Sequence, residues 1–245
     1  MLSHGLGDES SMISYSHCIA AARAPAGALV LGGDMKLIDL SQQLQHGSLS
    51  YPGTTSGVSI DHLDTDVEGI TVSVLDTFDP HCGTHYDAPL HFVPGALDVA
   101  SAPLVLPEVV LLSSAISPIP PEVLDGLLSS LEGRAVLFST GWEQHAATQA
   151  FFKDFPVLSK ELAIRLIQQR VALVGIDSPS VDGAVSSYPV HRALLSAGIP
   201  ILEGLVNLRA LIEPIENASR VRLAAFPLRI LGLEGSPVRA VALVE

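Results

Sequence analysis

Short apolar runs alternate with helical patterns in the second half of this 245-residue chain. The runs cover residues 135–139, 171–176 and 199–202, which are lengths typical of buried strands. Residues 160–170 lie between the first two runs and residues 190–197 between the last two, and both ranges have apolar side chains at helical spacing. Strands that alternate with helices predict an α/β fold, with two layers arranged around a mixed sheet.

The rest of the chain continues this pattern. Alternation of apolar and polar residues predicts two antiparallel strands at 58–63 and 69–78, which run into a histidine-rich stretch. Other expected elements are a first strand at 35–40, a strand at 108–113, short helices at 121–131 and 205–211, and a final strand pair at 221–231 and 238–244.

The first 34 residues differ from the remainder of the chain. They are rich in Ser, Gly and Ala and lack the regular apolar pattern that begins at Met35. No repeat or interdomain linker interrupts the sequence after that point. We therefore expect an N-terminal tail over residues 1–34, disordered or loosely packed, and a single domain over residues 35–245.

Composition narrows the function. The net charge of −13 and only 13 Lys and Arg residues argue against binding to nucleic acid or to anionic membranes. No apolar run reaches the length of a membrane span. Two cysteines are too few for a disulfide framework, which indicates a reducing compartment such as the cytoplasm. The 48% hydrophobic content favours a well-filled core and an oligomer interface.

The histidine-rich stretch spans residues 79–92. It holds His81, His85, Asp87 and His91, and its two prolines and one glycine exclude a continuous helix. The four side chains must therefore converge through loop or strand-end geometry. Imidazole and carboxylate together suit Zn²⁺, Mn²⁺ or Fe²⁺, so the stretch predicts a metal site; the alternative is a polar loop that holds these residues by chance.

Two distant residues are candidates to complete that site. His191 stands at the start of an expected helix, and Glu203 follows an apolar run in which a charge must be paired or metal-bound. Ligands in open α/β folds gather at strand ends, and one helix and one strand separate these two residues. Taken singly, His191 could be a capping or surface group and Glu203 an ordinary paired acid.

The histidine-rich stretch also resembles a family signature. Residues 81–92, His-Cys-Gly-Thr-His-Tyr-Asp-Ala-Pro-Leu-His-Phe, resemble the HxGTHxDxPxHF motif of the cyclase family of metal-dependent hydrolases, which includes kynurenine formamidases and isatin hydrolases. Further similar segments are 175–182, His191, Glu203, 227–230 and 236–240. The resemblance covers about residues 35–245.

The resemblance assigns roles to these residues. Five correspond to the family's metal ligands: His81, His85, Asp87, His191 and Glu203. His91 corresponds to the histidine that acts as general acid and base. The resemblance further implies a swivelling β/β/α domain, a homodimer or higher homo-oligomer, and one or two Zn²⁺ or Mn²⁺ ions per subunit.

The expected activity is hydrolysis of a C–N amide bond in a small molecule, first of all an aryl formamide such as N-formylkynurenine. Metals lower the pKa of bound water from about 15.7 to about 7. Thr84, Tyr86 and Phe92 give the broader family form of the motif, so an isatin-type cyclic amide, or a lactone, is the alternative. A non-catalytic metal- or ligand-binding protein on the same fold is an alternative of another class.

The roles of two further residues stay open. Cys82 lies between expected ligands and could bind metal, but in an extended segment its side chain points away from theirs, which favours a space-filling role. Trp142 follows a strand end and could stack on an aromatic substrate or pack in the core.

Overall fold

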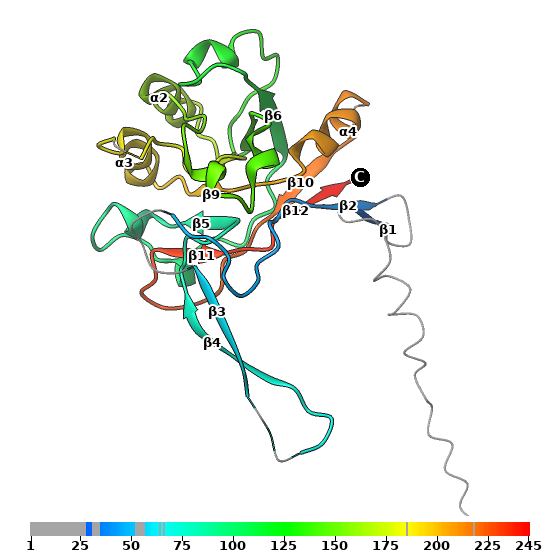
Figure 1. Cartoon of the computed structure of the whole chain (residues 1–245). Helices are drawn as coiled ribbons and strands as arrows, with labels where there is room; N and C mark the ends of the chain where they lie inside the picture. The colour runs from blue at the N-terminus through cyan, green and yellow to red at the C-terminus, as the bar shows by residue number, and fades with distance from the viewer. Residues whose placement is uncertain are drawn as a thin grey trace, which may run out of the picture.

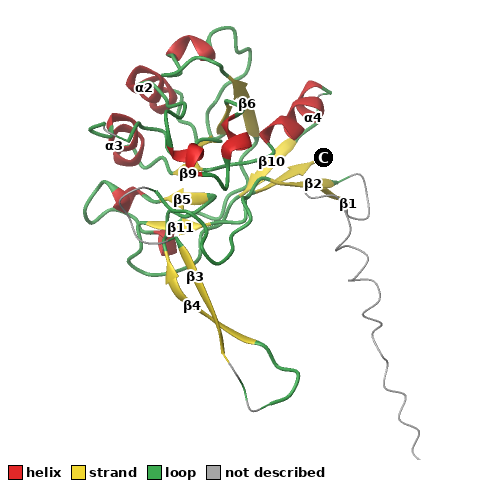
Figure 2. Ribbon diagram, viewed as in Figure 1, coloured by secondary structure: helices red, strands yellow, loops and turns green. Residues whose placement is uncertain are grey.

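The computed structural model describes residues 28–30, 35–51, 57–63, 65, 67–184, 186–217 and 219–245 (Figures 1 and 2). The strands are β1 (Ala28–Val30), β2 (Lys36–Asp39), β3 (Val58–Leu63), β4 (Val72–Phe78), β5 (His85–Asp87), β6 (Val109–Ser113), β7 (Ala135–Ser139), β8 (Leu173–Ile176), β9 (Ile201–Glu203), β10 (Val221–Ala224), β11 (Gly235–Pro237) and β12 (Val241–Val244). The α-helices are α2 (Lys160–Gln168), α3 (Pro189–Ser196) and α4 (Ile212–Glu216). Single 3-10 turns are η1 (Pro89–His91), η2 (Val99–Ser101), η3 (Pro121–Leu124), η4 (Trp142–His145), η5 (Gln149–Phe152) and η6 (Leu208–Leu211).

The strands form three sheets. A six-stranded mixed sheet has the order β11-β5-β9-β8-β7-β6, with parallel pairing from β9 to β6 and antiparallel pairing at the β11 end. A four-stranded antiparallel sheet has the order β1-β2-β12-β10, and β3 pairs with β4 in a separate hairpin. The expected mixed-sheet α/β class is confirmed.

Strand β7 shows how the layers are held together. Its side chains alternate between two hydrophobic cores: Ala135 and Leu137 pack with the four-stranded sheet, whereas Val136 and Phe138 pack with α2 and α3. All four are fully buried, as expected for a strand covered on both faces. The architecture is therefore β/β/α, as the family resemblance implied. The two-layer arrangement inferred from local patterns is wrong, because such patterns do not reveal which strands leave the main sheet.

Helix α2 begins where local chemistry places it. The Ser159 hydroxyl accepts a hydrogen bond from the Leu162 amide at 3.1 Å and so caps the first turn. Leu162, Ala163 and Leu166 lie on one face and are buried against the mixed sheet and α3. The expected helix at 160–170 is thus confirmed with a slightly earlier end.

Three expected elements are shorter than predicted. The helix at 121–131 is only the turn η3, because Gly126 with φ +81° follows it. The helix at 205–211 starts at Leu208, after Asn207 in the left-handed conformation, and continues into α4. The strand at 221–231 ends at Ala224, and Pro227 in the following segment has no amide to donate to a ladder.

The tail prediction falls largely outside the described residues. Within it, Ala28–Val30 form β1 and pair with β2. The division at residue 35 stays a prediction.

The β3–β4 hairpin extends away from the other sheets (Figure 1). The antiparallel pairing expected for 58–63 and 69–78 is confirmed, and the hairpin leads directly into the histidine-rich stretch. None of the described helices is long and apolar enough to cross a membrane.

Candidate functional site

Strand β5 positions the centre of the site. His85 and Asp87 are two residues apart, so their side chains project from the same face of the strand. Its neighbour β9 places Glu203 directly opposite His85, and β11 places Gly235 opposite Asp87. The six-stranded sheet therefore brings two carboxylates and one imidazole together from segments far apart in the chain.

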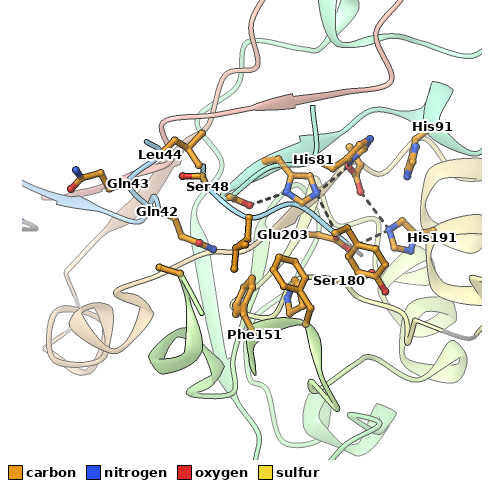
Figure 3. Close-up of a pocket in the computed structure, with 18 of the residues that line it drawn as sticks. Gln42, Gln43, Leu44, Ser48, His81, His91, Phe151, Ser180, His191 and Glu203 are labelled. Carbon is orange, nitrogen blue, oxygen red and sulfur yellow. Dashed lines mark hydrogen bonds and ion pairs between the residues drawn. The ribbon is translucent and has the colours of Figure 1, made fainter. Parts of the chain in front are cut away.

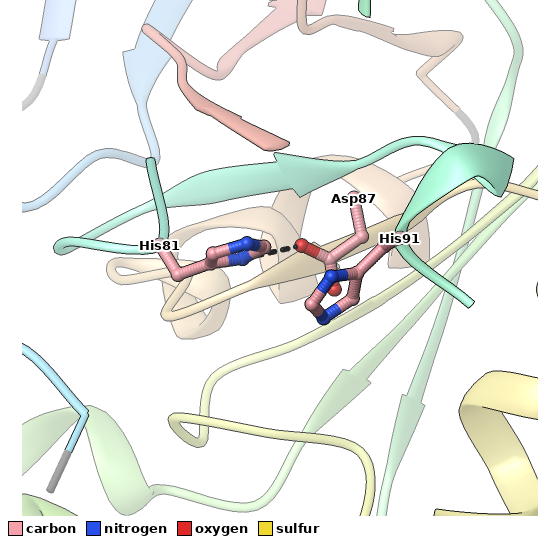
Figure 4. A group of neighbouring side chains, drawn as sticks. All are labelled: His81, Asp87 and His91. Carbon is pink, nitrogen blue, oxygen red and sulfur yellow. Dashed lines mark ion pairs between the residues drawn. The ribbon is translucent and has the colours of Figure 1, made fainter. Parts of the chain in front are cut away.

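Three more histidines reach this centre from other elements. His81 lies in the loop before β5, His91 in η1 and His191 in the first turn of α3 (Figures 3 and 4). The closest nitrogen–oxygen approaches are His81 Nδ1–Asp87 Oδ1 2.9 Å, His85 Nε2–Asp87 Oδ1 3.6 Å, His85 Nε2–Glu203 Oε2 3.4 Å, His191 Nε2–Asp87 Oδ2 3.4 Å and His191 Nε2–Glu203 Oε1 3.2 Å. The structure thus gathers all six residues that the sequence singled out.

Asp87 is the common point of this arrangement. Its side chain is fully buried, and neither carboxylate oxygen makes a hydrogen bond to any of the described residues. A buried carboxylate without a hydrogen bond is costly unless a cation compensates it. The donor set around it, imidazole nitrogen and carboxylate oxygen, is the set that divalent transition metals and zinc prefer. These residues therefore fit a metal ion.

The orientation of the imidazole rings also suits metal binding. Each proposed ligand histidine turns one ring nitrogen towards the centre and the other towards an oxygen outside it. The outer contacts are hydrogen bonds for His85 (Nδ1–Gly83 carbonyl, 3.0 Å) and His191 (Nδ1–Asp182 carboxylate, 2.8 Å). For His81 the outer contact is an ion pair, Nε2–Glu234 carboxylate at 3.5 Å, without a hydrogen bond among the described residues. Metal-ligating histidines typically show this pattern.

Charges in the metal-free site compensate one another. Burial opposes ionisation of Asp87, but the surrounding imidazoles, His81 foremost, outweigh it and hold the pKa of Asp87 well below its ordinary value. Burial likewise opposes a charge on Glu203, yet His191 and His85 lower its pKa to about 2. Burial disfavours the charged form of His81, but Asp87 raises its pKa to about 10. Metal binding would displace the imidazole protons.

Two groups of donor atoms share Asp87. His81, Asp87 and His91 form one group, and His85, Asp87 and Glu203 form the other, with the donor atoms of each group within 4.8 Å of one another. Groups that share a carboxylate can hold one or two ions.

His91 differs from the other histidines of the site. Its ring lies 4.4 Å from that of His81, centroid to centroid, and it lines the cavity. Burial lowers the pKa of His91 below its ordinary value, so the neutral form, which can accept a proton, is favoured.

A cavity of about 620 Å³ opens in front of these residues. Five aromatic residues line it, and we call them together the aromatic wall: Tyr51, Phe92, Phe151, Phe152 and Tyr188. Gln42, Gln43 and Gln45 also line it and contribute neutral polar groups. This volume accommodates a small aromatic molecule. Sequence reasoning missed most of these lining residues, because they follow no local motif and meet only in the folded chain.

Two open roles are resolved by contacts. Cys82 is buried, donates to the Leu49 carbonyl at 3.3 Å and belongs to neither donor group. Burial, with Asp79 nearby, raises its thiol pKa to about 11, so it is a space-filling residue. Trp142 is not among the cavity-lining residues; its indole N–H donates to the carbonyl of Phe151 at 2.9 Å and supports the aromatic wall.

Thr84 and Gly83 determine the backbone conformation around the site. The Thr84 hydroxyl donates to the Gly204 carbonyl at 2.6 Å and accepts from the Gln42 amide at 2.9 Å, which fixes the residue that follows Glu203. Gly83 has φ +65°, and a Cβ there would lie 2.6 Å from a methyl carbon of Leu44 in the cavity wall. Thr84 thus supports the site from outside the cavity, whereas Gly83 is one of the residues that line it.

Gly235→Ala is expected to weaken metal affinity about 10-fold or more, because a Cβ at that position would lie 2.6 Å from Cε1 of His81 and force the imidazole to move. Gly183→Ala is the matched control, since nothing lies within 4 Å of a Cβ there and its φ is ordinary. Zinc titration against a fluorescent chelator measures both variants. Equal affinity in the two variants would show that His81 does not require its present position.

Comparisons with known proteins agree with this geometry. Residues 38–183 match the Cyclase family ("Putative cyclase"). The kynurenine formamidase of Polaromonas naphthalenivorans is 30% identical over 213 residues, which cover 84% of this chain and 90% of that protein. A solved structure described as a predicted metal-dependent hydrolase from Bacillus stearothermophilus is 27% identical, with a TM-score of 0.70 over 86% of this chain and 99% of that one. An isatin hydrolase bound to the product analogue thioisatinate shares the fold at 21% identity, with a TM-score of 0.71 over 95% and 99%. The resemblance noted in residues 81–92 is confirmed, and the chain belongs to the cyclase family.

Proposed function

We propose that this chain is a metal-dependent hydrolase that cleaves a C–N amide bond, with an aryl formamide such as N-formylkynurenine as the first candidate substrate. The observation that carries the proposal is Asp87, a buried carboxylate that makes no hydrogen bond to the described residues and that ring nitrogens of three histidines approach. The named activity of the kynurenine formamidase relative supports the choice of bond.

The proposed metal ligands are His81, His85, Asp87, His191 and Glu203. A divalent ion held there would polarise the substrate carbonyl and increase the acidity of water. Zn²⁺ and Mn²⁺ both suit this donor set. The presence of Asp87 in both donor groups supports a site for two ions that share this carboxylate.

His91 is the proposed general acid and base. It lines the cavity beside His81, and its ring lies 5.9 Å from that of His191, centroid to centroid. From this position it would take a proton from the attacking water and return it to the departing nitrogen. The aromatic wall would hold the aryl ring of the substrate by stacking.

An isatin-type cyclic amide, or a lactone, is the second candidate substrate. Phe92 supports it, because this residue belongs to the broader form of the family motif and its ring lines the cavity. A non-catalytic metal- or ligand-binding protein remains the alternative of another class, and turnover separates it from both hydrolases.

Metal removal tests the proposal. Dialysis against EDTA is expected to abolish hydrolysis, and Zn²⁺ or Mn²⁺ is expected to restore it. Parallel assays with N-formylkynurenine and isatin identify the substrate type, and elemental analysis counts the ions. Full activity of the His85→Ala, Asp87→Ala double variant, or metal content without turnover of any amide or lactone tested, would refute the proposed activity.

The proposal extends to a cytoplasmic homodimer. Cys82 is a free thiol, as suits a reducing compartment. The β3–β4 hairpin exposes Val72, Val74 and Leu75, and a two-stranded hairpin is only marginally stable alone in water. A second subunit would cover part of this apolar surface. Light scattering coupled to size-exclusion chromatography measures the mass in solution.

A further inference from the structure

Asp182, the last residue of the family-like segment 175–182, is a buried carboxylate beside the site that the proposed ligand set does not include. It lies in the loop between β8 and α3, and only 3% of its surface is exposed. The backbone amides of Val190 and His191, in the first turn of α3, donate to it at 3.1 and 2.9 Å. These bonds fix the carboxylate against the helix start.

The same carboxylate contacts the imidazole of His191. Nδ1 of His191 lies 2.8 Å from Oδ2 of Asp182. An ionised carboxylate only accepts hydrogen bonds, so Nδ1 carries the proton and donates it. With that nitrogen engaged, Nε2 points to Oδ2 of Asp87 at 3.4 Å and to Oε1 of Glu203 at 3.2 Å.

The loop that carries Asp182 orients a second residue of the site. The amide of Val181 donates to Oε1 of Glu203 at 2.7 Å. Ser180, one residue earlier, accepts from the Asp182 amide at 3.3 Å through its hydroxyl. Two consecutive residues of one turn therefore set the directions of His191 and Glu203.

We propose that Asp182 is a positioning residue: it orients His191 so that Nε2 faces the metal site, and metal affinity depends on it. The inference rests on the proposed function only in taking His191 as a ligand. Without the carboxylate, the ring can rotate about its side-chain bonds, and Nδ1 has lost its acceptor. Loss of such an outer partner typically lowers metal affinity 10–100-fold.

Asp182→Ala, which removes the acceptor altogether, is the test variant, and Asp177→Ala is its matched control. Asp177 is also fully buried and also accepts backbone amides, from Thr140 and Gly141, but it contacts none of the proposed ligands. Zn²⁺ affinity is measured by chelator competition and folding by circular dichroism. ¹H–¹⁵N spectra of metal-free, ¹⁵N-histidine-labelled protein, assigned with His191→Gln, report the Nδ1 proton of His191.

The expected result is that Asp182→Ala stays folded, loses the slowly exchanging Nδ1 proton and binds Zn²⁺ 10–100-fold more weakly, whereas Asp177→Ala keeps both properties. Should Asp182→Ala not fold, Asp182→Asn replaces it, because its carbonyl oxygen can still accept from the amides of α3 but is an uncharged and weaker acceptor for Nδ1; a smaller loss of Zn²⁺ affinity is then expected.

Either of two results would overturn the inference: wild-type Zn²⁺ affinity in a folded Asp182 variant, or an equal loss in Asp177→Ala. Failure of the proposed function gives a different result. If wild-type protein binds Zn²⁺ but hydrolyses no amide, the affinity comparison still decides the role of Asp182. If it binds no metal, the Nδ1 proton signal decides whether Asp182 holds His191.

Discussion

Asp87→Asn is expected to abolish metal binding and to reduce hydrolysis at least about 1,000-fold, which corresponds to about 4 kcal/mol of transition-state stabilisation. Asp87 is the one residue common to both donor groups, and imidazole nitrogens approach both of its oxygens. An amide keeps the size of the side chain but removes the negative charge that a divalent ion requires.

Two measurements separate this effect from a loss of folding. Wild-type protein is expected to gain thermal stability when Zn²⁺ is added, because a ligand that binds only the folded state stabilises it. Asp87→Asn should show no such gain, while circular dichroism shows a folded protein. Asp125→Asn is the control, since its carboxylate is exposed and pairs with Arg165 at 2.8 Å, away from the cavity. A zinc-dependent stabilisation that survives in Asp87→Asn would contradict the assignment of Asp87 as a ligand.

His91→Asn is expected to reduce kcat about 100- to 10,000-fold while metal content stays at the wild-type level. Proton transfer by a positioned side chain typically contributes this much. Asparagine retains a polar side chain in the cavity but cannot exchange a proton near neutral pH. Steady-state kinetics together with elemental analysis of the purified variant measure both quantities.

The metal content of this variant is decisive, because His91 also belongs to one of the two donor groups. A loss of metal along with activity would make His91 a ligand and refute its role in proton transfer. His62→Asn is the control: this histidine is exposed on the β3–β4 hairpin and contacts Ser73 at 2.9 Å. It should retain both kcat and metal content.

Local sequence patterns predicted helices and strands correctly where the apolar residues follow a plain helix or strand spacing. Strands β7 and β8 are short, apolar and buried, and α2 has a capping serine and one apolar face, so neighbouring residues alone specify them. The sequence patterns did not predict how the strands are divided between the sheets. Strands β2, β10 and β12 form a second sheet, and nothing in their individual patterns distinguishes them from strands of the mixed sheet. Sheet membership depends on which surfaces pack together.

The residues of the site also differ in how far local sequence predicted them. The sequence by itself determined the group from His81 to His91, because its members are neighbours in a segment that cannot be helical, and their chemistry selects a metal. The downstream residues His191 and Glu203 were candidates from their places at a helix start and a strand end, and the family resemblance assigned them as ligands.

Only the tertiary structure decided how these groups meet. Strand β9 pairs with β5 and sets Glu203 opposite His85, and the loop at Asp182 turns His191 towards Asp87. The aromatic wall and the hydrogen-bond partners of each imidazole likewise come from segments distant in the chain. Their positions follow from strand order and packing, which are properties of the whole fold, and residue spacing along the chain does not encode them locally.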